Sequence, residues 1–447
     1  MVQNFMKEKK ILPLVISMSL PMVISMAVNS LYNIVDSYFV ANISEDAMTA
    51  ISLVYPVQNL MTAIGVGFGV GLNARIAFCL GANKQKEANQ AATTGLVLSF
   101  IHGIALMFIC ILGMPWFLSL YTSDKNIIEM GLIYADRAFL FSIIIMISIA
   151  LEKIFQAVGR MKVSMISMML GFVTNIVLDP LMIFGIGPFP EMGMAGAAYA
   201  TGIGQSVCLL TYIIFLFLRP IPISFRRKNI VFFKDLMSGL YSVGIPATLN
   251  MALPSALISS LNGILASFSD NYVLVLGAYY KLQSFIYLPV NGIIQGIRPL
   301  VGYNYGAGEH KRVTHIFYTA LVMAVTIMTA GTVLCWVVPG WLIGLFTTNP
   351  DTIALGIDAL HMISLGFIIS AVSVTCQGAL EGLGKGAPSL VISLARYLFL
   401  IIPAAFILSR IMQSASGVWI AFPVTEVIAA VISVVVYIRC QHREATS

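Results

Sequence analysis

The chain has 447 residues, of which 59% are hydrophobic and only 10% are charged, and its mean hydropathy is +0.92. Soluble globular proteins carry roughly 25% charged residues, so this composition indicates an integral membrane protein. Continuous apolar stretches of about 20 residues recur along the chain, which excludes a transmembrane β-barrel because barrel strands are short and alternate in polarity.

The apolar stretches predict an all-α polytopic membrane protein. The amino-terminal stretch is too long for a signal peptide and lacks a clear small-residue cleavage site, so we expect it to be retained as the first span. Twelve spans are predicted, at approximately 11–40, 47–79, 90–114, 127–151, 163–186, 193–218, 236–264, 272–304, 314–338, 353–377, 387–409 and 415–438.

Lysine and arginine residues predict the orientation of these spans. If the amino terminus lies inside, nearly all basic residues fall on the inner face, and only Lys125 and Arg410 fall on the outer face. We therefore expect a multi-pass protein of the cell (plasma or inner) membrane with both termini in the cytoplasm. This topology accounts for the net charge of +6, and no nucleic-acid partner is expected.

The first span, ILPLVISMSLPMVISMAVNSLYNIVDSYFV, carries one carboxylate, Asp36, near its end. An acid in hydrocarbon costs a few kcal/mol or more, so it is a functional-site candidate. Asn29, Asn33 and Asp36 recur at i, i+4 and i+7, on one helix face. The alternative for Asp36 is an acid near a helix end that reaches the outer interface.

The fifth and sixth spans carry further polar pairs at i, i+4 spacing: Asn175 with Asp179, and Thr201 with Gln205. Pro180 follows the acid and cannot donate a hydrogen bond, so we expect a kink or a freed carbonyl beside Asp179. The alternatives are a polar helix end for Asp179 and helix packing for the other three residues.

Estimated depth brings three of these residues together. At about 1.5 Å per residue, Asp36 lies about 39 Å along its helix from Lys10, and Asp179 lies about 26 Å from Lys162. Thr201 also falls in the outer half of its span. Two carboxylates at one depth repel each other when both are ionised, so we predict one site for a shared proton or a shared cation.

The sequence contains an internal repeat with an offset of 225 residues, without a gap over roughly 150 residues. Examples are Pro21/Pro246, Gln58/Gln283, Gly71/Gly296, Trp116/Trp341 and Gly159/Gly384. Each half then holds six spans and begins on the same side of the membrane. We predict an amino-terminal lobe (1–219), a cytoplasmic linker (220–230) and a carboxy-terminal lobe (231–447) around a central cleft, as in alternating-access transporters.

The repeat breaks at the acids, because the counterparts of Asp36 and Asp179 are Leu261 and Ala404. Glu426 in the last span is a second candidate proton carrier, whereas Arg298 either lines the cleft or extends to the inner face. The candidate residues of a substrate cavity are polar side chains of both halves: Asn29, Asn33, Gln205, Gln283, Arg298 and Glu426.

Five stretches spread over nearly the whole chain resemble the multidrug and toxic compound extrusion (MATE) family, in its bacterial DinF-like and MepA-like branch. They are SLPMVISMAVNSLYNIVDSYFV, GVGFGVGLNARIAFCLGANKQKEAN, FQAVGRMK (155–162), NIVLDPLMIFGIG (175–187) and IIQGIRPLVGYNYGAGEHKR (293–312). The resemblance implies twelve helices in two lobes that export organic cations or other amphiphiles against inward proton or sodium flow.

The resemblance also implies a cation-coupling site in the first lobe. Its residues would be Asp36, Asn175, Asp179 and Thr201, with Tyr32 one turn before the first acid. Some relatives couple through acids of the second lobe. The seventh span here has no acid in its apolar part, so that arrangement is not expected.

The resulting hypothesis is an antiporter whose partners are small amphiphilic or cationic compounds and the lipid bilayer, and which acts as a monomer. No cofactor or structural metal is expected beyond the coupling H⁺ or Na⁺, the latter at Asp36, Asn175 and Asp179. The alternative is a flippase for lipid-linked precursors, supported by Lys281, Arg298 and Arg396. An enzyme is not expected, because no HExxH, phosphate-binding loop or Ser/His/Asp grouping is present.

Overall fold

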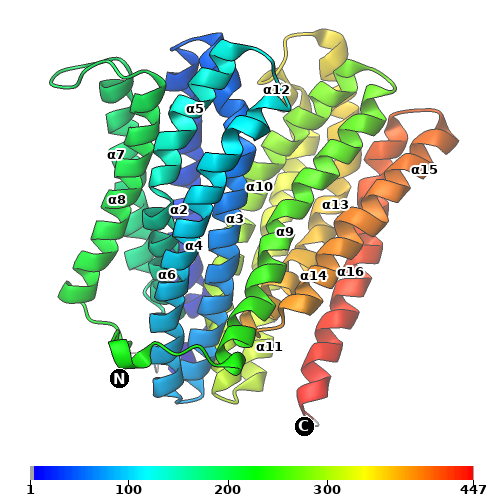
Figure 1. Cartoon of the computed structure of the whole chain (residues 1–447). Helices are drawn as coiled ribbons and strands as arrows, with labels where there is room; N and C mark the ends of the chain where they lie inside the picture. Colours follow the sequence, from blue (N-terminus) through cyan, green and yellow to red (C-terminus); the bar gives the residue numbers. More distant parts are fainter. Residues whose placement is uncertain (1–4, 446–447) are drawn as a thin grey trace. The chain divides into compact units, whose positions relative to one another are not determined.

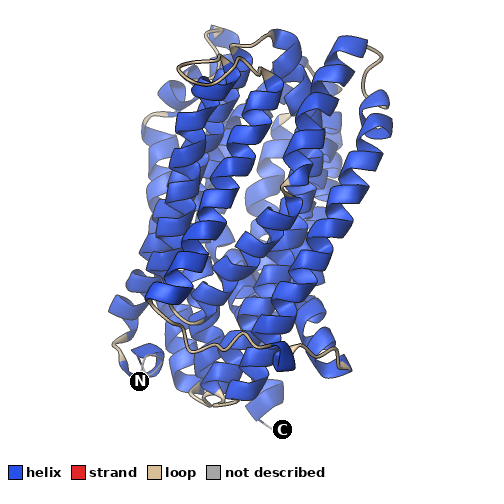
Figure 2. Cartoon of the chain, turned by 60° about the vertical axis from the view of Figure 1, so that its left-hand side comes forward, coloured by secondary structure: helices blue, strands red, loops and turns tan. Residues whose placement is uncertain are grey.

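The computed structural model describes residues 5–445, in which helices joined by loops form the fold and no strand is present (Figures 1 and 2). The helices are α1 Phe5–Glu8, α2 Ile11–Ala41, α3 Glu45–Gly81, α4 Gln85–Ser119, α5 Lys125–Leu140, α6 Ser142–Ala157, α7 Met161–Ile183, α8 Met194–Leu218, η1 Arg227–Asn229, α9 Lys234–Ala266, α10 Asp270–Gly306, α11 His310–Val337, α12 Pro339–Gly344, α13 Pro350–Gly382, α14 Gly386–Leu394, η2 Ala395–Ile401, α15 Ile402–Met412 and α16 Ser416–Ala445.

Within residues 5–445, 11 helices are long and apolar enough to cross a membrane, and a bent pair, α5 and α6, can supply the twelfth span. The predicted all-α membrane fold is therefore confirmed. The predicted fourth span, 127–151, corresponds to this pair, whose two helices meet at Phe141 with a bend of 49° that the sequence did not predict. The corresponding helix of the second half, α13, runs unbroken from Pro350 to Gly382.

The two halves begin their helices with the same local chemistry. The hydroxyl of Ser44 accepts a hydrogen bond from the third residue of α3, and that of Ser269, 225 positions later, accepts one from the second residue of α10. The side chains of Asp124 and Asn349, also 225 apart, each accept two backbone N–H bonds at the starts of α5 and α13. Such side-chain oxygens satisfy N–H groups that have no partner inside the helix. The repeat therefore includes the residues that cap the amino-terminal ends of these helices.

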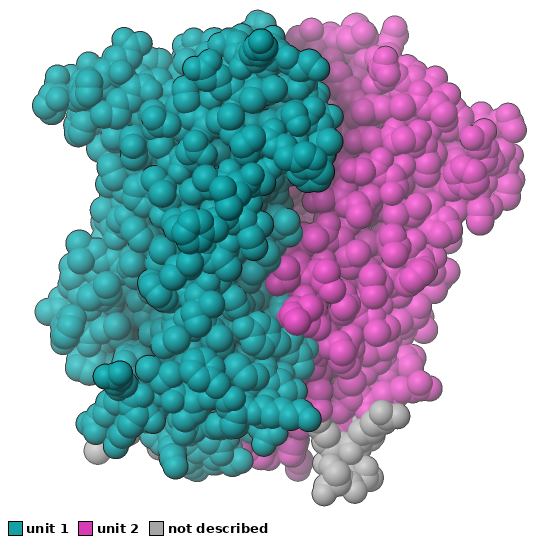
Figure 3. Space-filling model, in the orientation of Figure 1, with its two compact units in different colours: residues 1–5, 24–244 teal, residues 6–23, 245–447 magenta. Residues whose placement is uncertain are grey.

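The chain forms two compact units, coloured separately in Figure 3. Unit 1 consists of residues 1–5 and 24–244, and unit 2 consists of residues 6–23 and 245–447. Two helices therefore contribute to both units: α2 changes unit just after Pro21, and α9 changes unit just before Pro246. The two halves thus exchange helix starts: the start of α2 belongs to unit 2, and the start of α9 belongs to unit 1.

Glycines allow the exchanged helix starts to pack closely. In unit 1, a Cβ on Gly71 of α3 would lie 2.2 Å from the backbone oxygen of Leu240 of α9. In unit 2, the equivalent Gly296 of α10 packs against Ser19 of α2, where a Cβ would lie 2.5 Å from the hydroxyl. Only a residue without a side chain permits these approaches.

A π-helical segment, η2, changes the register of the repeat. A π turn adds one residue to a helix, and η2 interrupts the predicted eleventh span between α14 and α15. Beyond it, Gly417 of α16 packs on Leu408 as Gly196 of α8 packs on Met182. Met182 and Leu408 are 226 residues apart instead of 225, so the structural counterpart of Asp179 is Ala405, and the counterpart Ala404 expected from the constant offset is wrong.

Candidate cation and substrate sites

Unit 1 holds a buried polar cluster contributed by α2, α7 and α8. Asn175 and Asp179 of α7 are 2% and 0% exposed. The side-chain amide of Asn175 donates to Asp179 Oδ1 at 3.4 Å and to Thr201 Oγ1 of α8 at 3.3 Å. Asp36, from α2, is close enough to Asp179 for the two carboxyl groups to interact electrostatically. The structure thus brings together Asp36, Asp179 and Thr201, which the sequence places at similar depth, and adds Asn175 between them.

Close packing of α7 on α8 positions this cluster (Figure 1). A Cβ on Gly171 would lie 2.8 Å from the backbone oxygen of Gly204, and a Cβ on Gly204 would lie 2.7 Å from that of Gly171. The two helices therefore touch one turn below Asn175. At that separation a short side chain such as Thr201 can reach across to α7.

Aromatic residues surround the cluster. The ring of Tyr32 stacks on Phe172 of α7, with 5.3 Å between centroids and 9° between planes. Tyr32 and Tyr134 are neighbours of Thr201, and Gln58 donates to the Tyr134 hydroxyl at 3.1 Å. Tyr32 is a predicted site residue, whereas Tyr134 and Gln58 were not. The repeated pair of Gln58 with Gln283 is the sequence signal that could have indicated one of them.

Three oxygen atoms of the cluster are inaccessible to solvent and have no hydrogen-bond partner: Asp36 Oδ1, Asn175 Oδ1 and Asp179 Oδ2. None of the ion pairs found among the described residues includes either acid. Carboxylate and amide oxygens only accept hydrogen bonds. A proton or a hard cation that prefers oxygen ligands would satisfy them, so the residues fit a coupling-ion site.

The other polar residues predicted in the first half lie apart from these contacts. The side chain of Asn33 donates to the backbone oxygen of Asn29 at 2.8 Å, along its own helix, and it is exposed. Gln205 is half-buried one turn after Thr201. Their assignment to a substrate cavity stays a prediction.

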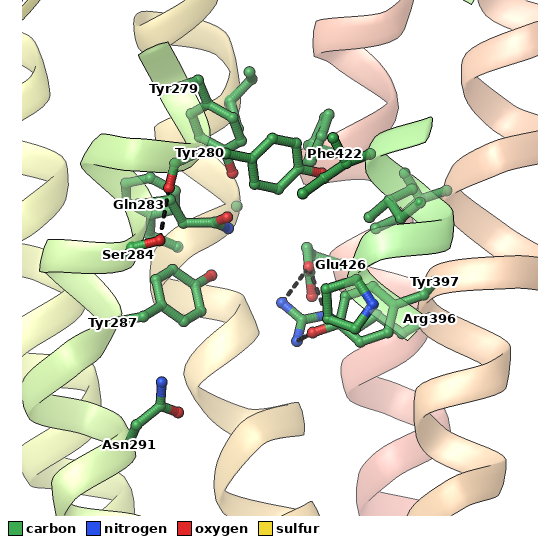
Figure 4. A pocket seen from close by; sticks show the side chains of 17 residues that line it. Tyr279, Tyr280, Gln283, Ser284, Tyr287, Asn291, Arg396, Tyr397, Phe422 and Glu426 are labelled. Carbon is green, nitrogen blue, oxygen red and sulfur yellow. Dashed lines mark hydrogen bonds and ion pairs between the residues drawn. The ribbon is translucent and has the colours of Figure 1, made fainter. Parts of the chain in front are cut away.

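Unit 2 contains a pocket of about 280 Å³ whose floor is a buried ion pair. Arg396 of η2 donates to Glu426 of α16 from Nε at 2.8 Å and from Nη2 at 2.6 Å, and both bonds end on the same oxygen, Oε1. Gln283 of α10 lines the same pocket and faces this pair (Figure 4). Two predicted residues, Gln283 and Glu426, therefore share one site, and Arg396 joins them although it was not predicted as a site residue.

Arg298 does not line this pocket. It forms an ion pair with Glu381 at 2.5 Å, and Glu381 also accepts hydrogen bonds from Asn250 at 3.1 Å and Ser389 at 3.3 Å. Arg298 is therefore held by a polar network of α9, α13 and α14.

A duplicated helical bundle with buried polar clusters defines a polytopic membrane transporter. The MatE family model matches residues 21–181 and 246–407, so the chain belongs to the MatE (multidrug and toxic compound extrusion) family and is a transporter, not an enzyme. The two matches start 225 residues apart and end 226 apart, in agreement with the extra residue of η2.

Individual relatives cover almost the whole chain. The multidrug export protein MepA of Staphylococcus haemolyticus is 25% identical over 440 residues, which are 98% of this chain and 96% of that protein. A MOP superfamily transporter from Pyrococcus furiosus superposes with a TM-score of 0.92 at 23% identity, with 98% of each chain covered. A MATE crystal structure in complex with MaL6 gives a TM-score of 0.93 at 23% identity and covers 100% of this chain and 99% of that one.

Proposed function

We propose that this protein is a cation-coupled antiporter that exports amphiphilic, mostly cationic compounds by alternating access. The observation that carries the proposal is the cluster of Asp36, Asn175 and Asp179, with three buried oxygens and no basic partner. The multidrug export function given in the names of the MepA relatives supports it. We further propose that both termini face the cytoplasm, as the distribution of basic residues predicts.

The coupling step follows from the two facing acids. With Asp36 and Asp179 both ionised, the carboxylates repel each other, and a bound H⁺ or Na⁺ removes this repulsion. Asp36 lies on α2, whose earlier residues belong to unit 2, so ion binding at Asp36 acts on a helix shared by both units. The proposed response is a bend of α2 at or beyond Pro21 that changes the shape of the cavity and releases the substrate outward.

For coupling, the ion and the substrate must have different affinities for the two arrangements of the transporter. An amphiphilic cation meets this condition if it binds the ionised acids, because the incoming ion then competes with it. The exported compound and the incoming ion would thus not bind to the cluster at the same time.

The test is export of a fluorescent organic cation from proteoliposomes, with proton and sodium gradients imposed separately. We expect one gradient to drive transport by the wild-type protein, and we expect Asp36→Asn and Asp179→Asn to reduce it to the level of empty liposomes. Asp270→Asn, at an exposed acid in the first turn of α10, is the matched control and should transport normally. Full gradient-driven transport by Asp36→Asn would contradict the proposal.

The structure weakens the support for a lipid-linked precursor flippase. That alternative needs a basic lining for phosphates, and it rested on Lys281, Arg298 and Arg396. Arg298 is neutralised by Glu381 and Arg396 by Glu426. The one cation of the three without such a partner, Lys281, is exposed and lies 5.7 Å from the centroid of the Phe346 ring. The family match likewise does not favour this alternative.

A further inference from the structure

The ion pair of unit 2 leaves one carboxylate oxygen unused. Glu426 is only 4% exposed, and its Oε1 atom accepts both bonds from Arg396, whereas Oε2 is inaccessible to solvent and has no partner. The third nitrogen of the guanidinium, Nη1, donates to the Tyr397 hydroxyl at 3.1 Å. A buried carboxylate oxygen without a donor is costly. Glu426 lines the pocket, so a small rotation of its carboxyl group would present this oxygen to a ligand that supplies the missing donor.

The position of Arg396 can hold a large side chain in unit 2 but not at the equivalent place in unit 1. Gly171, the unit 1 counterpart of Arg396, is pressed against α8 and can carry no side chain. In unit 2, the π segment that begins at Ala395 carries Arg396 in its first turn, and π segments are frequent at functional sites. Gly366 of α13 packs on the stem of Glu426, where a Cβ would lie 3.4 Å from Cγ. Glycine there leaves space beside the acid.

Aromatic residues form the walls of the pocket. In Figure 4, Tyr280 and Tyr287 of α10 lie across the space from Glu426 and Arg396, with Phe422 of α16 near Tyr280. The Tyr287 hydroxyl is occupied by Ser370 at 2.5 Å, whereas the Tyr280 hydroxyl is buried without a partner. Such walls suit a flat ring, and the volume of about 280 Å³ is just below the range of about 300–1,000 Å³ for drug-sized sites.

The mouth of the pocket is polar and accessible. Ser284 and Asn291 of α10 line it and are exposed, whereas Arg396 and Glu426 are 3% and 4% exposed. A ligand can therefore enter past polar side chains and place its ring between the aromatic walls. Its polar edge would then meet the ion pair at the floor.

The charge of the pocket decides the class of ligand. Arg396 and Glu426 are the charged residues among those that line it, and their charges cancel. A permanent cation buried here would find its attraction to Glu426 offset by repulsion from Arg396. We propose that the pocket binds uncharged, flat aromatic molecules that donate an N–H or O–H hydrogen bond to Glu426 Oε2. The role of such molecules as exported substrates rests on the export function proposed above.

Direct binding to the full-length protein in lipid nanodiscs tests this site. Carbazole is neutral, planar and fluorescent and carries one ring N–H, and N-methylcarbazole has the same ring system with a methyl group in place of the donor hydrogen. We expect carbazole to bind the wild type about 10–100-fold more tightly than its N-methyl analogue, because a hydrogen bond to a buried charged acceptor is lost. N-methylacridinium, a flat cation of similar size, should bind more weakly than carbazole.

Two variants keep the test decisive. The double variant Arg396→Met/Glu426→Leu removes the acceptor and leaves no unpaired charge, so the preference for carbazole should disappear. Ile258→Trp, at a half-buried lining residue, fills the pocket and leaves the ion pair intact, so it should abolish binding even if the double variant does not fold. Equal affinities for the two carbazoles, a preference that persists in either variant, or tighter binding of N-methylacridinium would overturn the inference.

The outcome is separable from that of the export experiment. Asp179→Asn changes the cluster of unit 1, so it should abolish coupled transport and keep the preference for carbazole. A wild type that prefers carbazole and exports nothing would contradict the proposed function only. A wild type that exports cations and does not prefer carbazole would contradict the pocket assignment only.

Discussion

Unit 1 and unit 2 share a helical plan and differ in the charges they bury. Unit 1 holds two facing acids, Asp36 and Asp179, without a basic partner, and unit 2 holds the neutralised pair of Arg396 and Glu426. The position equivalent to Asp36 is Leu261, which is fully buried in the hydrophobic core of unit 2. The duplicated scaffold therefore does not require an acid at either place. This difference is the basis for proposing ion binding in unit 1 and the binding of uncharged compounds in unit 2.

A second pair of buried charges shows the same division between scaffold and side chains. In unit 1, Lys153 and Glu152 of α6 bond to each other at 2.7 Å. In unit 2, Arg298 of α10 bonds to Glu381 of α13 at 2.5 Å. Arg298 is equivalent to Asn73 of unit 1, so the basic group comes from different helices in the two halves. Each unit contains a compensated pair of this kind, and among the described residues a buried acid without a basic partner occurs in unit 1 and not in unit 2.

The largest effect that would test this comparison is the loss of one partner of the unit 2 ion pair. We expect Arg396→Met and Glu426→Leu, each alone, to lower the free energy of unfolding by about 3–5 kcal/mol, because each leaves a buried charge uncompensated. The double variant should recover most of that loss. In unit 1, Asp179→Asn removes one of two like charges and should cost no more than about 1 kcal/mol.

Reversible unfolding of the purified variants in mixed micelles, analysed as a double-mutant cycle, measures these effects. Additive losses for the two unit 2 substitutions would show that the pair is not coupled. A loss for Asp179→Asn as large as that for Glu426→Leu would show that the two units do not differ in the way described here.

A smaller effect is expected at Gly171, the unit 1 counterpart of Arg396, which packs against α8. In Gly171→Ala, the new methyl group would lie 2.8 Å from the backbone oxygen of Gly204, which cannot move as a side chain can. We expect a loss of about 1–3 kcal/mol from this overpacking. Transport should fall as well, because α7 and α8 must separate and the bond between Asn175 and Thr201 lengthens.

The control for this substitution is Gly113→Ala in α4, where a Cβ would meet nothing within 4 Å. It should leave both stability and transport unchanged or slightly improved. If Gly171→Ala is as harmless as Gly113→Ala, the close approach of α7 and α8 does not exclude a side chain. The absence of an arginine there would then need another explanation.

The sequence predicts much of this structure because its strongest signals are periodic. Apolar length predicts the spans, and the constant offset predicts the duplication down to the equivalent caps Ser44 and Ser269. Depth counted along the spans, together with family resemblance, brings Asp36, Asn175 and Asp179 to one site. These features depend on the order of residues along one helix or on the similarity of two segments, so they can be predicted from the sequence without knowledge of contacts between helices.

Other features depend on contacts between helices and were therefore missed. The break at Phe141 has no proline to mark it, and the π segment around Arg396 has no sequence signature of its own. Nothing in the sequence distinguishes Tyr134 from the other tyrosines, because its link to the cluster is its position near Thr201 in the fold. The pairing of Arg396 with Glu426 joins residues on two different helices, so neither residue alone indicates a neutral pocket.

The smallest predicted effect tests whether the scaffold itself is equivalent in the two units. Ser44→Ala and Ser269→Ala each remove a cap that accepts a backbone N–H, at 3.0 Å from Ala47 and at 3.3 Å from Asn271. We expect each to lower the free energy of unfolding by about 1 kcal/mol. Ser52→Ala, whose hydroxyl only bonds to the carbonyl one turn earlier in α3, should change it by less than about 0.5 kcal/mol. Equal losses at the two caps would support a common scaffold in which the units differ only in their buried charges. A loss at only one cap would show that the units differ in their helix starts as well.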